Sequence, residues 1–301
     1  MRGNFVKDPY LLSPSAPPDI PSGWKLGPPD YVGVGTMKSG TTWWWSVLNS
    51  HPKVANPEDG VKDYLPSSDP GVVRKIYASK ETHFFDHYGR VEDFDLTLYH
   101  RYFPRPDGRI TGEWTPRYMW DFWTPPMLRA AAPDAKLLVL LRDPLDRFIS
   151  GLAHHLAKGL ELTPTLQHHH FSRGLYWQQL KNLLSYFDRA QVLILQYEQC
   201  VAEPVKQARR TFTFLGLDPH VWQPTTEINR PVAATVRLKP ILDEATKKAI
   251  CRAYQFDLSR LLVDFPEIDG LRWPTVAGGR RTDGAVKLTA ADRDPRSNKV
   301  I

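Results

Sequence analysis

One short segment combines a lysine, a glycine and hydroxyl side chains in a spacing that suits an anionic ligand. Residues 33–43 read Gly-Val-Gly-Thr-Met-Lys-Ser-Gly-Thr-Thr-Trp. Ser39 and Gly40 let the backbone turn tightly and aim its N–H groups inward, and the helix predicted to follow adds the positive end of its dipole. Lys38 adds a mobile cation, and the two threonines add hydroxyl donors. The segment therefore predicts a site for a phosphorylated ligand.

The order of these residues separates two kinds of phosphate-binding loop. In a nucleoside triphosphatase loop the lysine follows the glycines, as Gly-x-x-x-x-Gly-Lys-Ser/Thr. Here Lys38 comes before the glycine, and Thr41, Thr42 and Trp43 come after it. A P-loop kinase or triphosphatase would also need Mg²⁺ ligands, and no clear pattern of an apolar strand ending in aspartate supplies one. That class remains an alternative, as does a basic scaffold that binds polyanions without catalysis.

A second candidate anion site follows the apolar run at residues 136–141. Arg142 stands where a buried strand would end, and α/β sheets bind their ligands at the carboxyl ends of the strands. Its planar guanidinium suits bidentate contacts with phosphate. Ser150 lies about two helical turns further on, so its hydroxyl can face the same crevice. The alternative is a surface ion pair between Arg142 and Asp143 at the start of a helix.

Length and composition limit the class of protein. The chain has 301 residues, of which 42% are hydrophobic and 12% aromatic, so it can fold around one large core. A formal charge of +6 fits an anionic ligand but is too small to indicate a nucleic-acid partner. The two cysteines favour a reducing compartment. With no signal-peptide pattern and no apolar run near ~18 residues, we expect a cytoplasmic protein without a transmembrane anchor. The sequence leaves its oligomeric state open.

The order of the predicted elements favours one α/β domain. The proline-rich residues 1–30 predict an extended arm, and residues 274–301 predict a polar tail. The predicted strands are 31–35, 109–113, 136–141 and 191–195; the predicted helices are 41–50, 92–102, 123–132, one starting at Pro144, 171–187, 203–215 and 240–263. Strands that alternate with helices predict a central, mainly parallel sheet flanked by helices over residues 31–273. Residues 53–80 predict a long loop, and residues 81–85 form a short segment after it.

Together these motifs resemble the sulfotransferases that take sulfate from 3′-phosphoadenosine 5′-phosphosulfate (PAPS). The pattern Lys38-Ser39-Gly40-Thr41-Thr42-Trp43, followed by Arg142-Asp-Pro-x-x-Arg147-x-x-Ser150, is similar to their 5′-phosphosulfate and 3′-phosphate sites. Residues 80–86, Lys-Glu-Thr-His-Phe-Phe-Asp, resemble a segment of heparan sulfate O-sulfotransferases, and residues 112–118 resemble their Glu-Lys-Thr-Pro-x-Tyr motif. The resemblance covers roughly residues 31–273. It implies a fold related to P-loop nucleotide kinases, and the absence of a Golgi anchor fits a bacterial or otherwise cytosolic member.

The resemblance also implies roles for individual residues. The glutamate of this segment is the family's base, so Glu81 is the expected general base, and Lys38 is expected to stabilise the leaving phosphate. His83 would point to the same side as Glu81 in an extended segment, where it could orient the acceptor hydroxyl or share its proton. Arg230 or Arg237 is expected to complete the 3′-phosphate site. The residues expected to bind PAPS, and its product 3′,5′-ADP (PAP), are Lys38, Ser39, Gly40, Thr41, Thr42, Trp43, Arg142, Ser150 and Arg230. Trp43 could pack on the adenine or in the core.

The expected acceptor site departs from the heparan sulfate enzymes at one position. Trp114 stands where those enzymes carry lysine, and its flat face could stack on a sugar or an apolar group. Trp114 and Arg117, with Glu81 and His83, are the expected acceptor-binding residues. We therefore expect a neutral or weakly charged acceptor such as a sugar, a glycolipid or another small molecule.

The histidines raise the question of a metal site. His154 and His155, and the run at residues 168–170, lack the spacing of paired ligands on a helix, and no carboxylate motif accompanies them. We therefore expect no metal and predict that residues 168–170 form a mobile polar loop beside the acceptor cleft.

Overall fold

The structure is a computed structural model that describes residues 17–20, 22–55, 80–88, 95–224, 228 and 240–278. Some of the predictions above lie outside these residues. They are the roles of Arg230 and Arg237, the first part of the proline-rich arm, most of the loop at 53–80 and the tail beyond residue 278.

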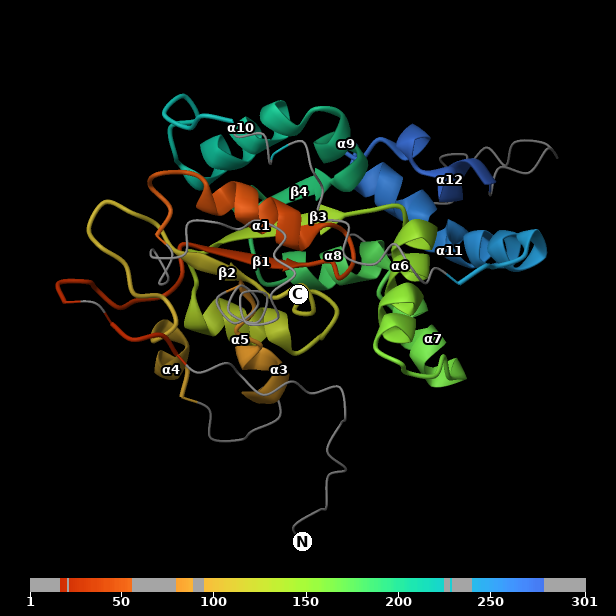
Figure 1. The fold of residues 1–301 in the computed structure, drawn as a ribbon, viewed down its shortest axis with the longest axis horizontal. Coiled ribbons are helices and arrows are strands. Elements are labelled where there is room, and N and C mark those ends of the chain that lie inside the picture. Colours follow the sequence, from red (N-terminus) through yellow and green to blue (C-terminus); the bar gives the residue numbers. More distant parts are fainter. Residues whose placement is uncertain are drawn as a thin grey trace, which may run out of the picture.

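A four-stranded parallel sheet forms the centre of the described part of the chain (Figure 1). Its strands are β1 (Tyr31–Gly35), β2 (Gly112–Trp114), β3 (Lys136–Leu141) and β4 (Val192–Gln196), in the order β2-β1-β3-β4. The chain adds β2 on one side of β1, and β3 and β4 on the other. The boundary between β1 and β3 is therefore the switch point at which open α/β sheets bind ligands. The predicted parallel α/β sheet is confirmed.

Burial on both faces explains why the two continuous apolar runs form the inner part of this sheet. β3 pairs with β4 from Leu137 opposite Val192 to Leu141 opposite Gln196. Leu138 and Leu140 point into one hydrophobic core, and their neighbours in β3 point into the other. Strands with no polar face are typical of parallel sheets covered by helices on both sides.

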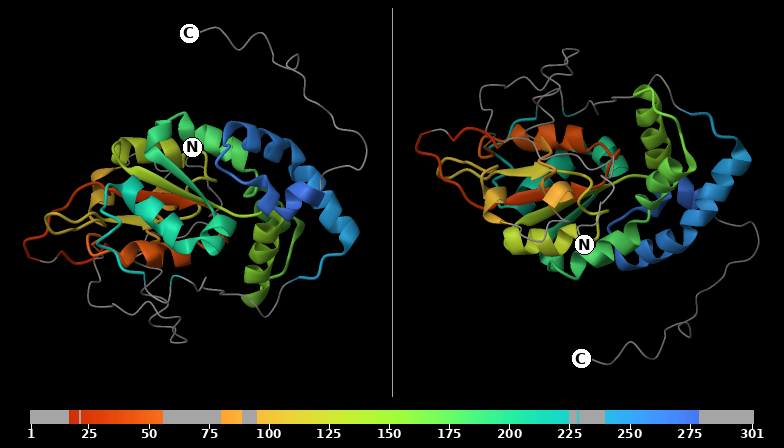
Figure 2. Two further views of the ribbon diagram at one scale, coloured as in Figure 1. Left: turned by 90° about the horizontal axis from the view of Figure 1, so that it is seen from above. Right: turned by 90° about the horizontal axis from the view of Figure 1, so that it is seen from below.

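Helices cover both faces of the sheet (Figures 1 and 2). On one face α1 (Thr41–Asn49) and α10 (Pro204–Leu215) contribute to the core with Leu138 and Leu140. The other face packs against α3 (Phe84–Tyr88), α4 (Thr97–His100), α5 (Thr124–Ala131), α8 (Tyr176–Leu184) and α11 (Glu244–Asp264).

A helical pair stands beside the carboxyl ends of the strands. It consists of α6 (Pro144–Ala157) and α7 (Pro164–Ser172), which Figure 1 shows projecting away from the sheet. The remaining helices are α9 (Tyr197–Ala202) and α12 (Pro274–Gly278), with 3₁₀ turns at Arg189–Gln191 and Gly270–Arg272. Within the described residues, each helix is too short or too polar to cross a membrane.

Several predicted boundaries are wrong. Residues 171–187 do not form one helix: α7 ends at Ser172, and α8 starts at Tyr176. Between them, a Cβ on Gly174 would lie 2.7 Å from the Tyr254 hydroxyl oxygen, so this close approach favours glycine at the break. The histidine run at 168–170 is helical rather than a mobile loop, because Thr163 caps α7 and proline occupies its first turn.

Other elements are shifted or shortened. The predicted helix at 92–102 is described only as α4, with residues 92–94 outside the described part. The strand predicted at 109–113 is β2 at Gly112–Trp114. In the short segment at 81–85, the residues from Phe84 onward belong to α3. The first residues of the predicted tail form α12.

Candidate active site

The loop between β1 and α1 has the geometry of an anion site. Gly40 precedes α1 with φ of 90°, in the left-handed region that favours glycine. Among the described residues no side-chain hydrogen bond caps this end of the helix, so its first N–H groups can face a ligand. A Cβ on Gly40 would lie 2.8 Å from the Tyr197 ring, which leaves no room for another residue.

Hydrogen bonds fix this loop on the neighbouring strand. The hydroxyls of Thr36 and Ser39 share a hydrogen bond of 2.5 Å, and Thr36 also donates to the carbonyl oxygen of Leu140 in β3, at 3.0 Å. Lys38 at the tip has a φ of 67° and is partly exposed, as is Thr42. The predicted 5′-phosphosulfate residues therefore lie together on a loop tied to two adjacent strands.

Arg142 meets this loop from the end of β3. Its Nη1 donates to the carbonyl oxygen of Lys38 at 3.3 Å, and its guanidinium lies 4.9 Å from the centre of the Tyr197 ring. Its Nη2 lies 3.6 Å from Asp146 Oδ2. Its buried Nε has no hydrogen-bond partner among the described residues. The half-buried Ser150 follows on α6. The structure thus joins the two predicted anion sites at the switch point.

A chain of charged side chains leads from the same loop to the predicted base. The buried Lys80 donates to Thr41 Oγ1 at 3.3 Å, and its Nζ lies 2.5 Å from Glu81 Oε1. The other oxygen, Glu81 Oε2, lies 3.2 Å from His83 Nε2. His83 Nδ1 in turn lies 2.7 Å from Asp86 Oδ2. The sequence reasoning assigned no role to Lys80, although it directly precedes Glu81 in the motif.

Charges around Glu81 and His83 keep both groups ionised. Burial favours the neutral form of Glu81, but Lys80 and His83 outweigh it and hold its pKa at about 2. Burial likewise opposes a charge on His83, but bonds to Asp86 and Glu81 raise its pKa to about 9. At neutral pH His83 is therefore an imidazolium between two carboxylates. Both its ring nitrogens are engaged, so His83 positions Glu81 here rather than orienting an acceptor.

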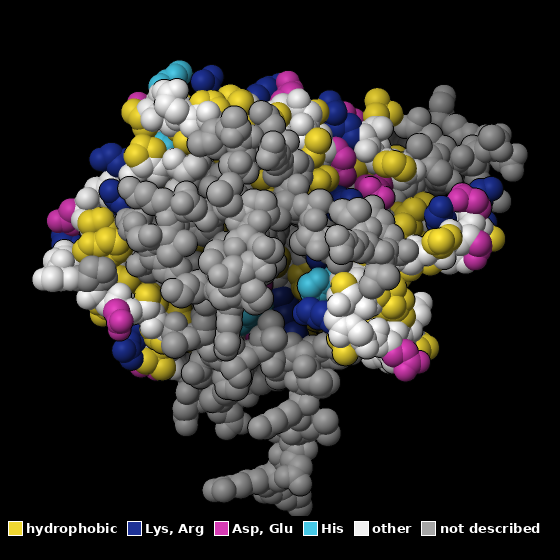
Figure 3. Space-filling view, in the orientation of Figure 1, with side chains coloured by type: hydrophobic (Ala, Val, Ile, Leu, Met, Phe, Trp, Pro, Cys, Tyr) yellow, Lys and Arg dark blue, Asp and Glu magenta, His cyan; other side chains and the backbone are white. Residues whose placement is uncertain are grey.

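The loop tip is an unfavourable place for a cation. Burial, and then the charges of Lys158, Arg142 and Lys80, lower the pKa of Lys38 to about 8. Burial and Lys38 also lower the pKa of His154 on α6 to about 4. Figure 3 shows Lys, Arg and His side chains in the hollow between the sheet and the α6–α7 pair. A bound anion would relieve this repulsion.

A buried carboxylate beneath the site holds its segments together. Glu113 in β2 is fully buried. It accepts hydrogen bonds from the backbone N–H and hydroxyl of Thr82 and from the hydroxyls of Tyr99, Thr115 and Tyr118. Burial raises its pKa despite these donors. Glu113 therefore fixes the backbone next to Glu81, a role the sequence reasoning missed.

The predicted acceptor contact of Trp114 is wrong. Its side chain is 0% exposed. Successive strand residues point to opposite faces of a sheet, so Trp114 points away from Glu113 and into the core beneath α1. There it covers Gly33, where a Cβ would lie 2.1 Å from the indole, and its Nε1 donates to the carbonyl oxygen of Gly35 at 3.1 Å. Its face is closed to any ligand.

Two other predicted contacts give way to internal packing. Arg117 is buried, its Nε lies 2.6 Å from Asp121 Oδ2, and its guanidinium stacks near Trp120. This pairing replaces the expected acceptor contact. Trp43 is also buried, with its ring edge-on to Trp44 and Tyr197, so the core role prevails over packing on adenine.

The histidines of α6 and α7 contact each other. His170 Nε2 lies 2.8 Å from His155 Nδ1, and burial lowers the pKa of both rings. In the described part of the chain, no group of three His, Cys, Asp or Glu side chains is placed to hold a metal ion.

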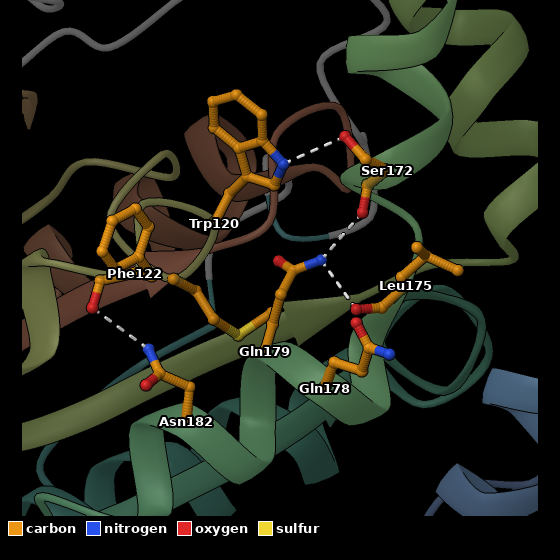
Figure 4. A pocket seen from close by; sticks show the side chains of 8 residues that line it. Trp120, Phe122, Ser172, Leu175, Gln178, Gln179 and Asn182 are labelled. Atoms are coloured by element: carbon orange, nitrogen blue, oxygen red, sulfur yellow. Dashed lines mark hydrogen bonds between the residues drawn. The ribbon is translucent and has the colours of Figure 1, made fainter.

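A cavity of about 370 Å³ opens between the segment after β2 and the break between α7 and α8 (Figure 4). Its lining combines apolar and aromatic side chains with neutral polar ones: Met119, Trp120, Phe122, Ser172, Leu175, Gln178, Gln179 and Asn182. Trp120 Nε1 donates to Ser172 Oγ at 3.1 Å, while Phe122 is 74% exposed. Met119 lines the cavity and also lies against Gly35, at the end of β1.

Comparison with known proteins agrees with this architecture. The model of the sulfotransferase domain family matches residues 28–238. The chain is similar to heparan sulfate glucosamine 3-O-sulfotransferase 6 of Mus musculus, with 32% identity over 203 residues, covering 63% of this chain and 52% of that protein. It is also similar to heparan sulfate glucosamine 3-O-sulfotransferase 3B1 of Homo sapiens, with 30% identity over 205 residues, covering 63% of this chain and 46% of that protein.

The chain thus spans about half the length of the curated relatives it matches. Its fold is similar to the crystal structure of a sulfotransferase from Alicyclobacillus acidocaldarius, with a TM-score of 0.56, 20% identity and coverage of 81% of this chain and 98% of that one. The resemblance inferred from the motifs is confirmed. With its parallel sheet and a family match over residues 28–238, this chain belongs to the sulfotransferase domain family.

Proposed function

We propose that this protein transfers the sulfuryl group of PAPS to a hydroxyl group of an acceptor. One observation carries the proposal: the buried Lys80 connects the anion loop at Thr41 with the carboxylate of Glu81. Sulfuryl transfer needs a base close to the anion site, because the acceptor must lose a proton as the donor's phosphate departs. Here a single side chain, that of Lys80, lies between the two.

The residues at the switch point fit the donor. Uncapped N–H groups at the start of α1, with Lys38, would hold the 5′-phosphosulfate. The Arg142 guanidinium, whose buried Nε has no partner among the described residues, would hold the 3′-phosphate with the Ser150 hydroxyl. PAPS supplies the activated sulfuryl group.

The protein's own residues would then act by positioning and charge. Glu81 takes the proton of the acceptor hydroxyl, and the acceptor oxygen bonds to sulfur as the bond from sulfur to the leaving phosphate oxygen breaks. Lys38 offsets the charge on that phosphate. His83 and Asp86 keep the carboxylate oriented. As in phosphoryl transfer, positioning and electrostatics supply most of the rate.

For the acceptor we propose a neutral sugar, glycolipid or other partly apolar molecule. The cavity beside Trp120 supports this choice, because the described side chains that line it are apolar, aromatic or neutral polar. The exposed Phe122 offers an aromatic surface, whereas Arg117 and Arg173 already lie over the Trp120 ring. Amides can bond sugar hydroxyls in either direction. The similar 3-O-sulfotransferases act, by their names, on heparan sulfate, so that polymer is the competing acceptor.

Two measurements test the proposal. Thermal stabilisation by 3′,5′-ADP should exceed that by ATP-Mg²⁺ or duplex DNA; at 100 times its dissociation constant a ligand adds about 2.7 kcal/mol. Transfer from ³⁵S-labelled PAPS should then be screened with neutral glycosides, glycolipids, phenols and heparan sulfate. Stabilisation by ATP-Mg²⁺ alone would indicate a kinase-like protein. Efficient transfer to heparan sulfate alone would refute the neutral acceptor.

A further inference from the structure

Lys80 lies between the expected donor site at the start of α1 and the proposed base, Glu81. Its side chain is fully buried, yet it has two polar partners. The first, Thr41, begins α1, where the donor's anion would lie; the second, Glu81, is the proposed base. An ammonium group has three N–H donors and a flexible stem, so one lysine can bond on both sides.

Other charges also face Glu81, but their roles differ from that of Lys80. His83 contacts Glu81 from the same segment, and Asp86 holds the far side of His83. Lys38 on the anion loop and His154 on α6 also interact with Glu81, but through longer-range electrostatics. Lys80 contacts both Glu81 and the start of α1.

From this placement we propose that Lys80 changes partner when the donor binds. In the free protein it pairs with Glu81. Once an anion occupies the start of α1, Lys80 turns toward that anion and releases Glu81 to accept the acceptor's proton. This inference rests on the proposed function and adds to it a positioning residue that activates the base only in the donor-loaded protein.

Electrostatics supports the exchange. A carboxylate in contact with an ammonium group is a weak base, because protonation would forfeit the ion pair. A phosphosulfate or phosphate group carries more charge than a carboxylate and attracts the ammonium more strongly in a buried site. The movement required is small, because Nζ already lies 3.3 Å from Thr41 Oγ1. Base strength would then depend on donor binding.

The carboxyl carbon of Glu81 reports this exchange. It can be followed by NMR in ¹³C-glutamate-labelled protein from pH 4 to pH 7, with Glu81→Gln used to assign its signal. In the free protein we expect no titration in this range. With saturating 3′,5′-ADP we expect the titration midpoint to rise by about two pH units or more, into the lower part of the range. An unchanged signal in protein that has bound the ligand would overturn the inference.

Variants separate this role from a structural one. Lys80→Met should raise the Glu81 midpoint without ligand and remove the effect of 3′,5′-ADP on it. Lys80→Arg keeps the charge and should retain a ligand-dependent midpoint. Lys136→Met is the matched control, because Lys136 lies at the opposite end of β3 and packs on Phe214; it should behave like the wild type. A Lys80→Met protein that titrates like the wild type would refute the proposal.

The NMR titration of the wild-type protein with and without 3′,5′-ADP tests the proposal even if a variant fails to fold. It also distinguishes the two proposals. Failure of 3′,5′-ADP to stabilise the protein contradicts the proposed function itself. Stabilisation without any change at Glu81 contradicts only the exchange by Lys80.

Discussion

Arg142 donates a hydrogen bond to the carbonyl oxygen of Lys38, 3.3 Å away, and so joins the end of β3 to the loop after β1. The two residues are far apart in sequence but meet because β1 and β3 are neighbours at the switch point of the sheet. A ligand with one anionic group at each residue would therefore bridge two strands.

Arg142→Ala should weaken binding of 3′,5′-ADP by an order of magnitude or more. The lost charge-assisted hydrogen bonds contribute about 1.5–3 kcal/mol each. Isothermal titration calorimetry measures the change. Adenosine 5′-phosphosulfate, which lacks the 3′-phosphate, serves as the control ligand and should bind the variant about as well as the wild type. Equal losses for both ligands would show that Arg142 does not contact the 3′-phosphate.

Glu81→Gln should reduce turnover by ~10²-fold or more while leaving the affinity for 3′,5′-ADP near that of the wild type. The amide keeps the size of the side chain but cannot accept the proton. Turnover is measured by transfer from labelled PAPS to the acceptor found in the screen. Glu244→Gln on the exposed start of α11 is the matched control. If Glu81→Gln keeps most of its activity, Glu81 is not the base.

The affinity for 3′,5′-ADP should fall as the pH rises through about 8, because Lys38, whose pKa is about 8, loses its charge there. A bound anion favours the charged amine and raises its pKa. Above pH 8 binding therefore requires uptake of a proton, whereas below pH 8 the affinity does not depend on the ionisation of Lys38. Titrations from pH 7 to pH 9.5 avoid ionisation of the phosphates, which occurs near pH 6. Lys38→Met should bind more weakly and lack the step at pH 8. Persistence of that step in the variant would assign it to another group.

Gly40→Ala should destabilise the protein more than Gly159→Ala, as measured by urea unfolding. Both glycines have positive φ values, so each alanine carries a backbone cost of about 1–2 kcal/mol. A Cβ at Gly40 also meets the Tyr197 ring at 2.8 Å, whereas a Cβ at Gly159 meets no described atom within 4 Å. Overpacking should add about 1–3 kcal/mol at Gly40. Equal losses would mean that the Tyr197 ring moves freely aside.

Phe122→Ala should raise the acceptor KM without changing the affinity for 3′,5′-ADP, because its exposed ring lines the cavity proposed for the acceptor. Phe256→Ala is the matched control, since Phe256 is also exposed but lies on α11. Initial rates with the acceptor found by labelled PAPS measure both variants. An unchanged KM would place the acceptor outside this cavity.

The anion loop, the parallel sheet and the contact region of Arg142 could be predicted because local patterns determine them. A short apolar run that ends in a glycine-containing turn specifies a strand, a loop and a helix start within a few residues. The ends of parallel strands necessarily share one edge. Glu81 and His83 came from a motif, and the structure brings them together.

The side chains that the sequence misassigned depend on packing between distant segments. Trp114 follows Glu113 directly, and the motif alone does not say which of the two faces the site. The pairing of β2 with β1 determines which residue faces the core, because the space over Gly33 accepts the Trp114 indole. The break between α7 and α8 likewise depends on Tyr254, which lies far along the chain. A role for Lys80 can be recognised only in the fold, because its partner Thr41 lies far away in the sequence.

The fit of Trp114 against Gly33 also constrains how this sequence can change over evolution. A Cβ at position 33 would lie 2.1 Å from the indole, so neither residue can be exchanged alone without a collision or a void. Relatives that carry lysine at the position of Trp114 should therefore carry a larger residue at that of Gly33. We expect the two positions to change together, so that a smaller side chain on β2 is matched by a larger one on β1 and the loop after β1 keeps its position.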